Sequence, residues 1–149
     1  MSVLKQVLSA FRASEPDPLP DPDAKLAIGA LMVQIAMSDR DYQLSEISLI
    51  DKVLARLFSL GPIEAAKMRA TCEKLHAAAP DTETFASLIR SELDEASRGD
   101  ALTALWQVVI ADGEVQDNET AIVETARLAL GLTVADNAAA RARAEAALA

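Results

Sequence analysis

The chain has 149 residues, enough for one globular domain with a real core and too few for two ordinary ones. Its 23 acidic and 14 basic residues give a formal net charge of −9, and a surface of that sign repels nucleic acid and anionic lipid, which leaves cations and basic protein surfaces as the natural partners. Apolar residues make up 51% and aromatic residues only 3%, so we expect a core of Ala, Leu, Val and Ile in a domain rich in helix.

The chain begins with a short segment, residues 2–13, whose apolar residues recur at helical spacing. Five side chains form this stripe: Val3, Leu4, Val7, Leu8 and Phe11. The pattern predicts an amphipathic N-terminal helix over residues 1–13. Such a helix could dock peripherally on a membrane or on a protein partner, but packing on its own domain is the favoured interpretation.

A spacer over residues 14–22 alternates prolines with acids. Proline removes the donors that helices and sheet ladders need, so we expect an extended, stiff path that joins the first helix to the body. Such a strip can also serve as a recognition segment. Residues 23–149 then form the helical domain.

Helical periodicity continues almost to the end of the chain, with no period-2 alternation of a half-buried strand. The pattern and the turn residues Gly61-Pro62, Pro80-Asp81, Gly113 and Gly131 predict seven helices, near 23–38, 45–59, 62–79, 82–96, 99–111, 117–130 and 134–148. The predicted class is all-α, a compact bundle of about seven to eight helices once residues 1–13 are counted. No apolar run approaches the roughly 20 residues that span a bilayer, and no signal-peptide pattern opens the sequence, so we expect a cytoplasmic protein.

The chain has a single cysteine, Cys72, and a single histidine, His76. One cysteine excludes an intramolecular disulfide and a cysteine-based zinc site. The two residues lie one helical turn apart and could form a weak metal or thiol site, but core packing for one and a surface position for the other is the favoured interpretation.

The sequence contains an internal repeat: residues 33–50 align without a gap on residues 106–123. Four pairs are identical: Gln34 with Gln107, Asp39 with Asp112, Gln43 with Gln116, and Glu46 with Glu119. Apolar positions also match, among them Val33 with Trp106, which we therefore assign to the core. Each copy predicts an apolar helix, an acidic turn and a second amphipathic helix. We expect two helical hairpins related by a pseudo-twofold axis, which could bring both acidic turns to one end of the domain.

The acidic turns have a structural interpretation. Gly113 suits the left-handed position that ends a helix, and Tyr42 and Val115 could anchor the two turns in the core. Glu46 and Glu119 suit the first turn of the following helix, where the helix dipole favours negative charge. On this hypothesis the motif only reverses the chain.

The alternative hypothesis is that the acidic turns supply oxygen ligands to a hard divalent cation such as Ca²⁺, Mg²⁺ or Mn²⁺. The pattern is not an EF-hand. Counted from Asp112, the sixth residue is Asp117 where glycine is required, and the twelfth is Val123 where a bidentate glutamate is required.

The second copy of the repeat resembles the TerB tellurite-resistance family and the related N-terminal domain of DjlA-type membrane co-chaperones. The residues that carry the resemblance are Leu105-Trp106, Ala111-Asp112-Gly113-Glu114, Val115, Glu119 and Leu130-Gly131-Leu132. The first copy fits through Asp39 and Glu46, and the resemblance covers roughly residues 23–135. It implies a compact helical domain associated with tellurite and stress resistance, often alongside membrane and calcium-binding proteins.

The resemblance also implies an acidic face on which metal binding has been proposed. Carried over, the metal ligands are Asp39, Glu46, Asp112 and Glu119, with Asp41 and Glu114 as secondary candidates. Arg40 stands where the family has glycine after Asp39, so its guanidinium could neutralise these carboxylates in place of an ion.

Three functions compete at this stage. The first is a non-catalytic stress-response module whose acidic face binds a divalent cation or a basic protein. The second is a helical scaffold for protein partners in which the acidic turns are purely structural. The third, an enzyme, is disfavoured because the sequence shows no nucleophile beside a base and no phosphate-binding glycine loop.

Overall fold

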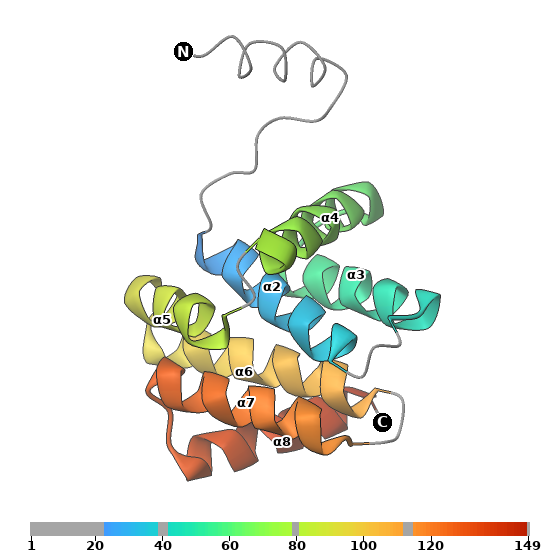
Figure 1. Cartoon of the computed structure of the whole chain (residues 1–149). Coiled ribbons are helices and arrows are strands. Elements are labelled where there is room, and N and C mark those ends of the chain that lie inside the picture. Colours follow the sequence, from blue (N-terminus) through green and yellow to red (C-terminus); the bar gives the residue numbers. More distant parts are fainter. Residues whose placement is uncertain (1–22, 39–41, 79–80, 112–114, 149) are drawn as a thin grey trace, which may run out of the picture.

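The computed structural model describes residues 23–38, 42–78, 81–111 and 115–148. Within these ranges it contains no strand and seven helices: α2 (Ala24–Met37), α3 (Leu44–Phe58), α4 (Pro62–Ala78), α5 (Thr82–Glu92), α6 (Glu95–Ile110), α7 (Asp117–Leu130) and α8 (Val134–Leu148). The all-α class is confirmed (Figure 1). The predicted N-terminal helix and the spacer lie outside the described residues.

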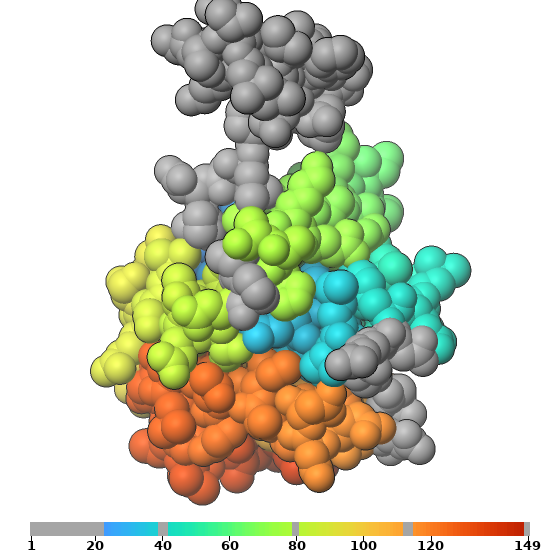
Figure 2. Space-filling model, viewed as in Figure 1, coloured from blue at the N-terminus to red at the C-terminus, as the bar shows by residue number. Residues whose placement is uncertain are grey.

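Helix α2 is the centre of the bundle. Ten of its 14 residues are buried, because the helix is apolar on every side and is stable only where other helices surround it. It packs against α3, α4, α5, α6 and α7. Figure 1 shows it in the middle, with α3 and α4 on one side and α6, α7 and α8 on the other. In Figure 2 a patch of α2 reaches the surface between α4 and α7.

The crossing of α2 and α4 is close because Gly29 has no side chain. A Cβ atom added at Gly29 would lie 2.3 Å from the Sγ atom of Cys72, too near for any real contact. The thiol of Cys72 is buried, and it donates a hydrogen bond to the Leu26 carbonyl at 3.5 Å. Glycine at this position therefore lets the two helices meet.

Helix α6 forms the second buried layer with α7 and α8, and α5 packs on α2 and α7. Trp106 on α6 is only 4% exposed, and its partner in the repeat, Val33, is fully buried, which confirms both as core residues. The indole Nε1 donates to Asn137 Oδ1 at 2.8 Å, and the guanidinium of Arg141 lies over the ring, 4.7 Å from its centroid. These contacts join α8 to the body.

The predicted junction between the fifth and sixth helical segments was wrong. Helix α5 ends at Glu92 rather than near 96, because Leu93 takes an extended conformation. Helix α6 begins at Glu95 rather than 99, because the carboxylate of Asp94 accepts a hydrogen bond from the Ser97 amide at 2.8 Å and caps the new helix.

The sequence repeat corresponds to two helix–turn–helix units with equivalent boundaries. The first helices of the two units end at Met37 and Ile110, and the second helices begin at Leu44 and Asp117. Both pairs are aligned in the repeat. The pseudo-twofold relation between the two hairpins remains a prediction.

The end of α7 confirms a predicted turn. Gly131 has φ 73°, the left-handed conformation that glycine adopts without strain. The Arg98 guanidinium donates to the Leu130 carbonyl at 2.6 Å, and Arg127 donates to the Leu132 carbonyl at 2.9 Å. Cations thus bind the negative end of the α7 dipole.

Candidate functional site

Two of the six candidate ligands, Glu46 and Glu119, lie within the described residues, and they hold equivalent places. Each is the third residue of its helix, Glu46 in α3 and Glu119 in α7. The residues that precede the two helices, Gln43 and Gln116, are both extended. Both glutamates thus occupy the same position at helix starts of the same kind.

The carboxylate of Glu119 is buried, with 5% of the residue exposed. Its Oε1 atom accepts a hydrogen bond from the backbone N–H of Gln116 at 3.2 Å. This bond satisfies an amide at the start of the helix that has no partner within the helix itself. Glu119 therefore caps the start of α7, from the first-turn position that the structural hypothesis gave it.

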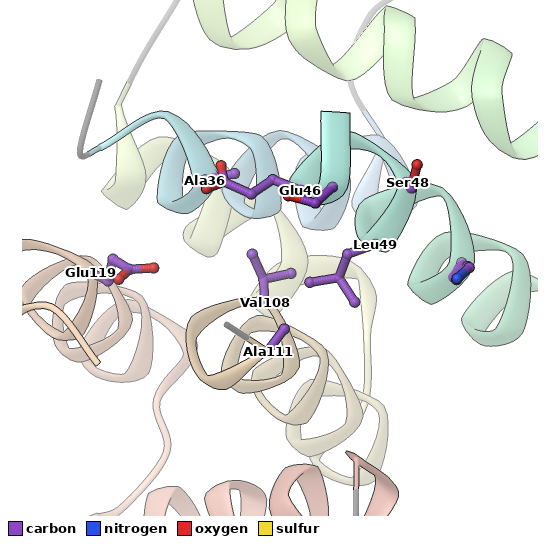
Figure 3. Close-up of a pocket in the computed structure, with 9 residues that line it drawn as sticks. Ala36, Glu46, Ser48, Leu49, Val108, Ala111 and Glu119 are labelled. Carbon is purple, nitrogen blue, oxygen red and sulfur yellow. The ribbon is translucent and has the colours of Figure 1, made fainter. Parts of the chain in front are cut away.

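A pocket of about 370 Å³ brings the two glutamates to one site. We call it the acidic pocket; its lining residues are Ala36, Ser45, Glu46, Ser48, Leu49, Lys52, Val108, Ala111 and Glu119. Figure 3 shows Glu46 reaching in from α3 and Glu119 from α7, with Val108 and Leu49 below Glu46 in this view. Carboxylates from both copies of the repeat thus share one cavity.

A hydrogen bond joins the segments that flank the two acidic turns. Asn118 on the first turn of α7 donates its Nδ2 to the backbone carbonyl of Ser38 at 2.8 Å. Ser38 follows the last residue of α2, directly before the first acidic turn. The end of one hairpin's first helix therefore lies against the start of the other hairpin's second helix.

The other four candidate ligands, Asp39, Asp41, Asp112 and Glu114, lie outside the described residues. The same holds for Arg40 and Gly113. Their assignment to a shared site remains a prediction. Within the ranges that the structure describes, no group of three or more His, Cys, Asp or Glu side chains is placed to hold a metal ion.

The acidic pocket also contains residues that the sequence did not single out. Ser45, Ser48 and Lys52 line it from α3. With Leu49 they follow the spacing i, i+3, i+4, i+7, which places them on one face of that helix. That spacing was visible in the sequence, but nothing there showed that this face borders a cavity. Lys52 is the one basic residue among those that line the pocket.

The two copies of the motif differ in how the turn meets the core. Tyr42 packs against the hydrophobic core, as the structural hypothesis requires, whereas Val115 is 41% exposed and does not anchor its turn. Burial and the nearby carboxylate of Glu73 raise the pKa of the Tyr42 phenol, so it stays protonated at any ordinary pH. Tyr42 is therefore attached to the core, whereas Val115 is not.

An ion-pair network near Tyr42 was not expected from the sequence. The Nε atom of Arg69 on α4 lies 2.7 Å from Oδ1 of Asp51 on α3. Its Nη1 atom lies 3.1 Å from Oε1 of Glu73 on the same helix. The hydrogen bond to Asp51 raises the pKa of Arg69 further above its already high value. Arg69 and Glu73 have the i, i+4 spacing of a helical pair, but the cross-helix partner depends on the fold.

Cys72 and His76 do not form a reactive pair. Burial raises the pKa of the Cys72 thiol to about 12, which keeps it protonated, and a thiol in this state is a poor nucleophile and metal ligand. His76 is partly buried, and burial lowers its pKa below 6.5. Both residues lie on α4, which does not line the acidic pocket.

Comparison with known proteins identifies the chain's relatives. The profile of a family described as "Tellurite resistance protein TerB" matches residues 25–142, more than three quarters of the chain. No curated protein and no solved structure matches it. None of the helices in the described part of the chain has the length and apolar character needed to cross a membrane.

Proposed function

Because this chain belongs to the TerB tellurite-resistance family, we propose that it is a non-catalytic, stress-associated module of the cytoplasm whose acidic pocket binds a divalent cation. One observation carries the proposal. Glu46 and Glu119 come from different helices and different copies of the repeat, yet they line the same pocket. Like charges that share a cavity repel each other, and a bound cation removes that cost.

The chemistry of the pocket fits a hard cation. Carboxylate and hydroxyl oxygens are the ligands that Ca²⁺, Mg²⁺ and Mn²⁺ prefer, and the pocket offers Glu46, Glu119 and two serines. Two carboxylates do not complete a calcium site, which takes about six to eight oxygens. In this proposal Asp39 and Asp112 supply further ligands, with Asp41 and Glu114 beside them.

Lys52 limits the affinity that the acidic pocket can have for a cation. The residue lines the same pocket, and its positive charge opposes the binding of a cation there. Removing Lys52 is expected to raise the affinity for a divalent cation. A basic protein segment that displaces Lys52 is the alternative ligand for the same carboxylates.

The second candidate function is a protein-binding scaffold in which the acidic residues are structural only. The hydrogen bond from the Gln116 amide to Glu119 favours it, because that bond gives Glu119 a reason to be present without any metal. The two functions differ in what they require of Glu119. Capping requires an oxygen acceptor, whereas cation binding requires a negative charge.

The test is calorimetric titration of the full chain with Ca²⁺, Mg²⁺ and Mn²⁺. We expect one of them to bind the parent protein, and the Glu46→Gln, Glu119→Gln double variant to lose that binding. Glutamine keeps the shape and an oxygen acceptor but removes the charge. Glu64→Gln is the matched control, since Glu64 is also the third residue of its helix, α4, but lies outside the pocket.

A second readout is thermal stability. A ligand present at about 100 times its dissociation constant stabilises a protein by about 2.7 kcal/mol. For a chain of this length that corresponds to a rise in Tm of roughly 5–11 °C. No heat on titration, together with an unchanged Tm on adding EDTA or metal, would reject cation binding and favour the scaffold.

A further inference from the structure

Apolar side chains line part of the acidic pocket, and others are exposed on the segments that adjoin it in the chain. Leu49 and Val108 line it from within. Met37 and Leu44 adjoin lining residues in the chain and are 40% and 76% exposed. Val115, between the lining residues Ala111 and Glu119, is 41% exposed. The Asn118–Ser38 hydrogen bond holds the Met37 and Val115 segments in one neighbourhood. Clustered apolar side chains bordered by charged ones mark a surface that binds another polypeptide.

The charges around the pocket select the kind of polypeptide. Glu46 and Glu119 line it, and Asp117 is exposed at the first position of α7. Lys52 lies on the α3 side. A segment that combines an apolar stripe with positive charge therefore suits this surface, with its cations directed toward α7 and away from Lys52.

The chain itself contains such a segment. Residues 1–13 include Lys5 and Arg12 and no acidic residue, whereas the whole chain has a net charge of −9. The five apolar residues of its stripe require a partner surface if they are to leave water. These residues lie outside the described part of the chain.

The spacer is long enough to bring this segment to the pocket. The body begins at Asp23, and Ala36 of the pocket lies near the far end of α2. Helical rise puts these two points about 20 Å apart. The nine residues of the 14–22 spacer reach about 28 Å in a polyproline conformation. The reach thus exceeds the separation.

We propose that residues 2–13 dock as an amphipathic helix on the acidic pocket of the same molecule, with their apolar stripe over Leu49 and Val108. Docked in this way the segment covers Glu46 and Glu119, so a divalent cation or a basic partner must displace it. A tether this short gives an effective concentration on the order of millimolar, so even weak contacts keep the segment in place. The regulatory consequence rests on the proposed function, whereas the docking does not.

Paramagnetic broadening measured in EDTA tests the docking. Cys72 is buried and unreactive, so a nitroxide attached to Ser9→Cys labels the full chain at one position, off the apolar stripe. We expect the amide signals of Ser45, Leu49 and Val108 to broaden strongly, and that of Ala140 on α8 to change little. The added Leu8→Asp substitution, which places a charge on the stripe, should restore the pocket signals.

Two outcomes overturn the proposal. One is a set of pocket signals that the label leaves unchanged. The other is broadening that also appears when labelled chain is mixed with separate ¹⁵N-labelled chain lacking the nitroxide, which would make a second copy the occupant. Unchanged amide positions across α8 confirm that each variant is folded.

Regulation is tested separately by adding Ca²⁺ or Mg²⁺, which are diamagnetic, to the labelled chain. We expect the broadening to fall as the cation binds. Docking that persists in the presence of a cation shown calorimetrically to bind overturns the regulatory part alone. Absence of any cation binding overturns the proposed function and leaves the docking result as measured in EDTA.

Discussion

The strongest test of the site's physical basis is the replacement of Glu119 by alanine and by glutamine. Glu119 is 5% exposed, its Oε1 accepts the Gln116 N–H at 3.2 Å, and it faces the pocket that Glu46 also lines. Alanine removes the acceptor, the buried methylene and the charge. Glutamine removes only the charge.

The expected cost of Glu119→Ala follows from these contacts. A hydrogen bond to a charged acceptor contributes about 1.5–3 kcal/mol, and the lower end applies because the exposed Gln116 amide can turn to water instead. The buried methylene adds about 0.8 kcal/mol. We therefore expect a loss of about 2 kcal/mol in the free energy of unfolding, or about 4–8 °C in Tm. Glu119→Gln keeps the acceptor and should cost under about 1 kcal/mol.

Urea unfolding followed by circular dichroism at 222 nm, the usual wavelength for helix content, measures these differences. Glu64→Ala serves as control, because Glu64 is exposed at the corresponding position of α4 and should change stability by no more than about 0.5 kcal/mol. The reasoning fails if Glu119→Ala matches the control. It also fails if glutamine is as damaging as alanine, since the backbone bond would then not be the relevant interaction.

Three further predictions follow from other parts of the molecule. Gly29→Ala should destabilise the protein by about 1–3 kcal/mol, because the added Cβ would overlap the sulfur of Cys72. The same substitution should cost less free energy of unfolding in a Cys72→Ala background. Equal costs in the two backgrounds, measured as a double-mutant cycle, would contradict the predicted clash. Burial lowers the pKa of His76 in the folded chain below 6.5, so the unfolded chain takes up a proton first and the free energy of unfolding falls as the pH drops below about 6.5. His76→Gln should therefore make Tm depend less on pH between about pH 7.5 and pH 5.5. An unchanged dependence of Tm on pH would show that burial does not perturb this imidazole. Asn118→Ala removes the hydrogen bond to the Ser38 carbonyl and should lower the free energy of unfolding by about 1 kcal/mol. It should also weaken cation binding measured by calorimetry. An undiminished affinity for the cation would mean that the segments flanking the two turns need not be held together.

Most of the fold could be predicted from the sequence because its signals are local and agree with one another. Helix α2 is apolar all round, and only a central position satisfies such a helix. The repeat aligns Met37 with Ile110 and Leu44 with Asp117, and these residues are the helix boundaries in the structure. Gly131 marks a turn through its own conformational freedom.

The predicted helix boundaries are wrong at the junction of α5 and α6, where helical periodicity in the sequence is a stronger signal than a single helix cap. Periodicity extended the predicted fifth helix past Leu93 to residue 96, whereas the cap formed by Asp94 and Ser97 starts a new helix at Glu95. A serine three residues after an aspartate is a common spacing, and it becomes a helix start only when the chain before it turns away. Leu93 does so by adopting an extended conformation.

The candidate site was predictable in part. The repeat placed Glu46 and Glu119 at equivalent positions, and the structure brings both to one pocket. The Asn118–Ser38 bond and the position of Lys52 depend on how the two hairpins pack, which no local pattern encodes. The different environments of Tyr42 and Val115 likewise arise from α4, which packs against the first hairpin through α2 and α3.

Capping and cation binding need not exclude each other at Glu119. A carboxylate has two oxygens with about four lone-pair directions, and the Gln116 N–H takes one of them. The cap fixes the side chain in one orientation, so less side-chain entropy is lost when an ion binds. A glutamate at a helix start of this kind is therefore well placed to bind a metal ion. Its capping role alone also explains why a glutamate is present there. Charge is what separates the two roles: glutamine fulfils the first and not the second, which is why a Glu119→Gln variant that folds normally yet binds no cation would be decisive.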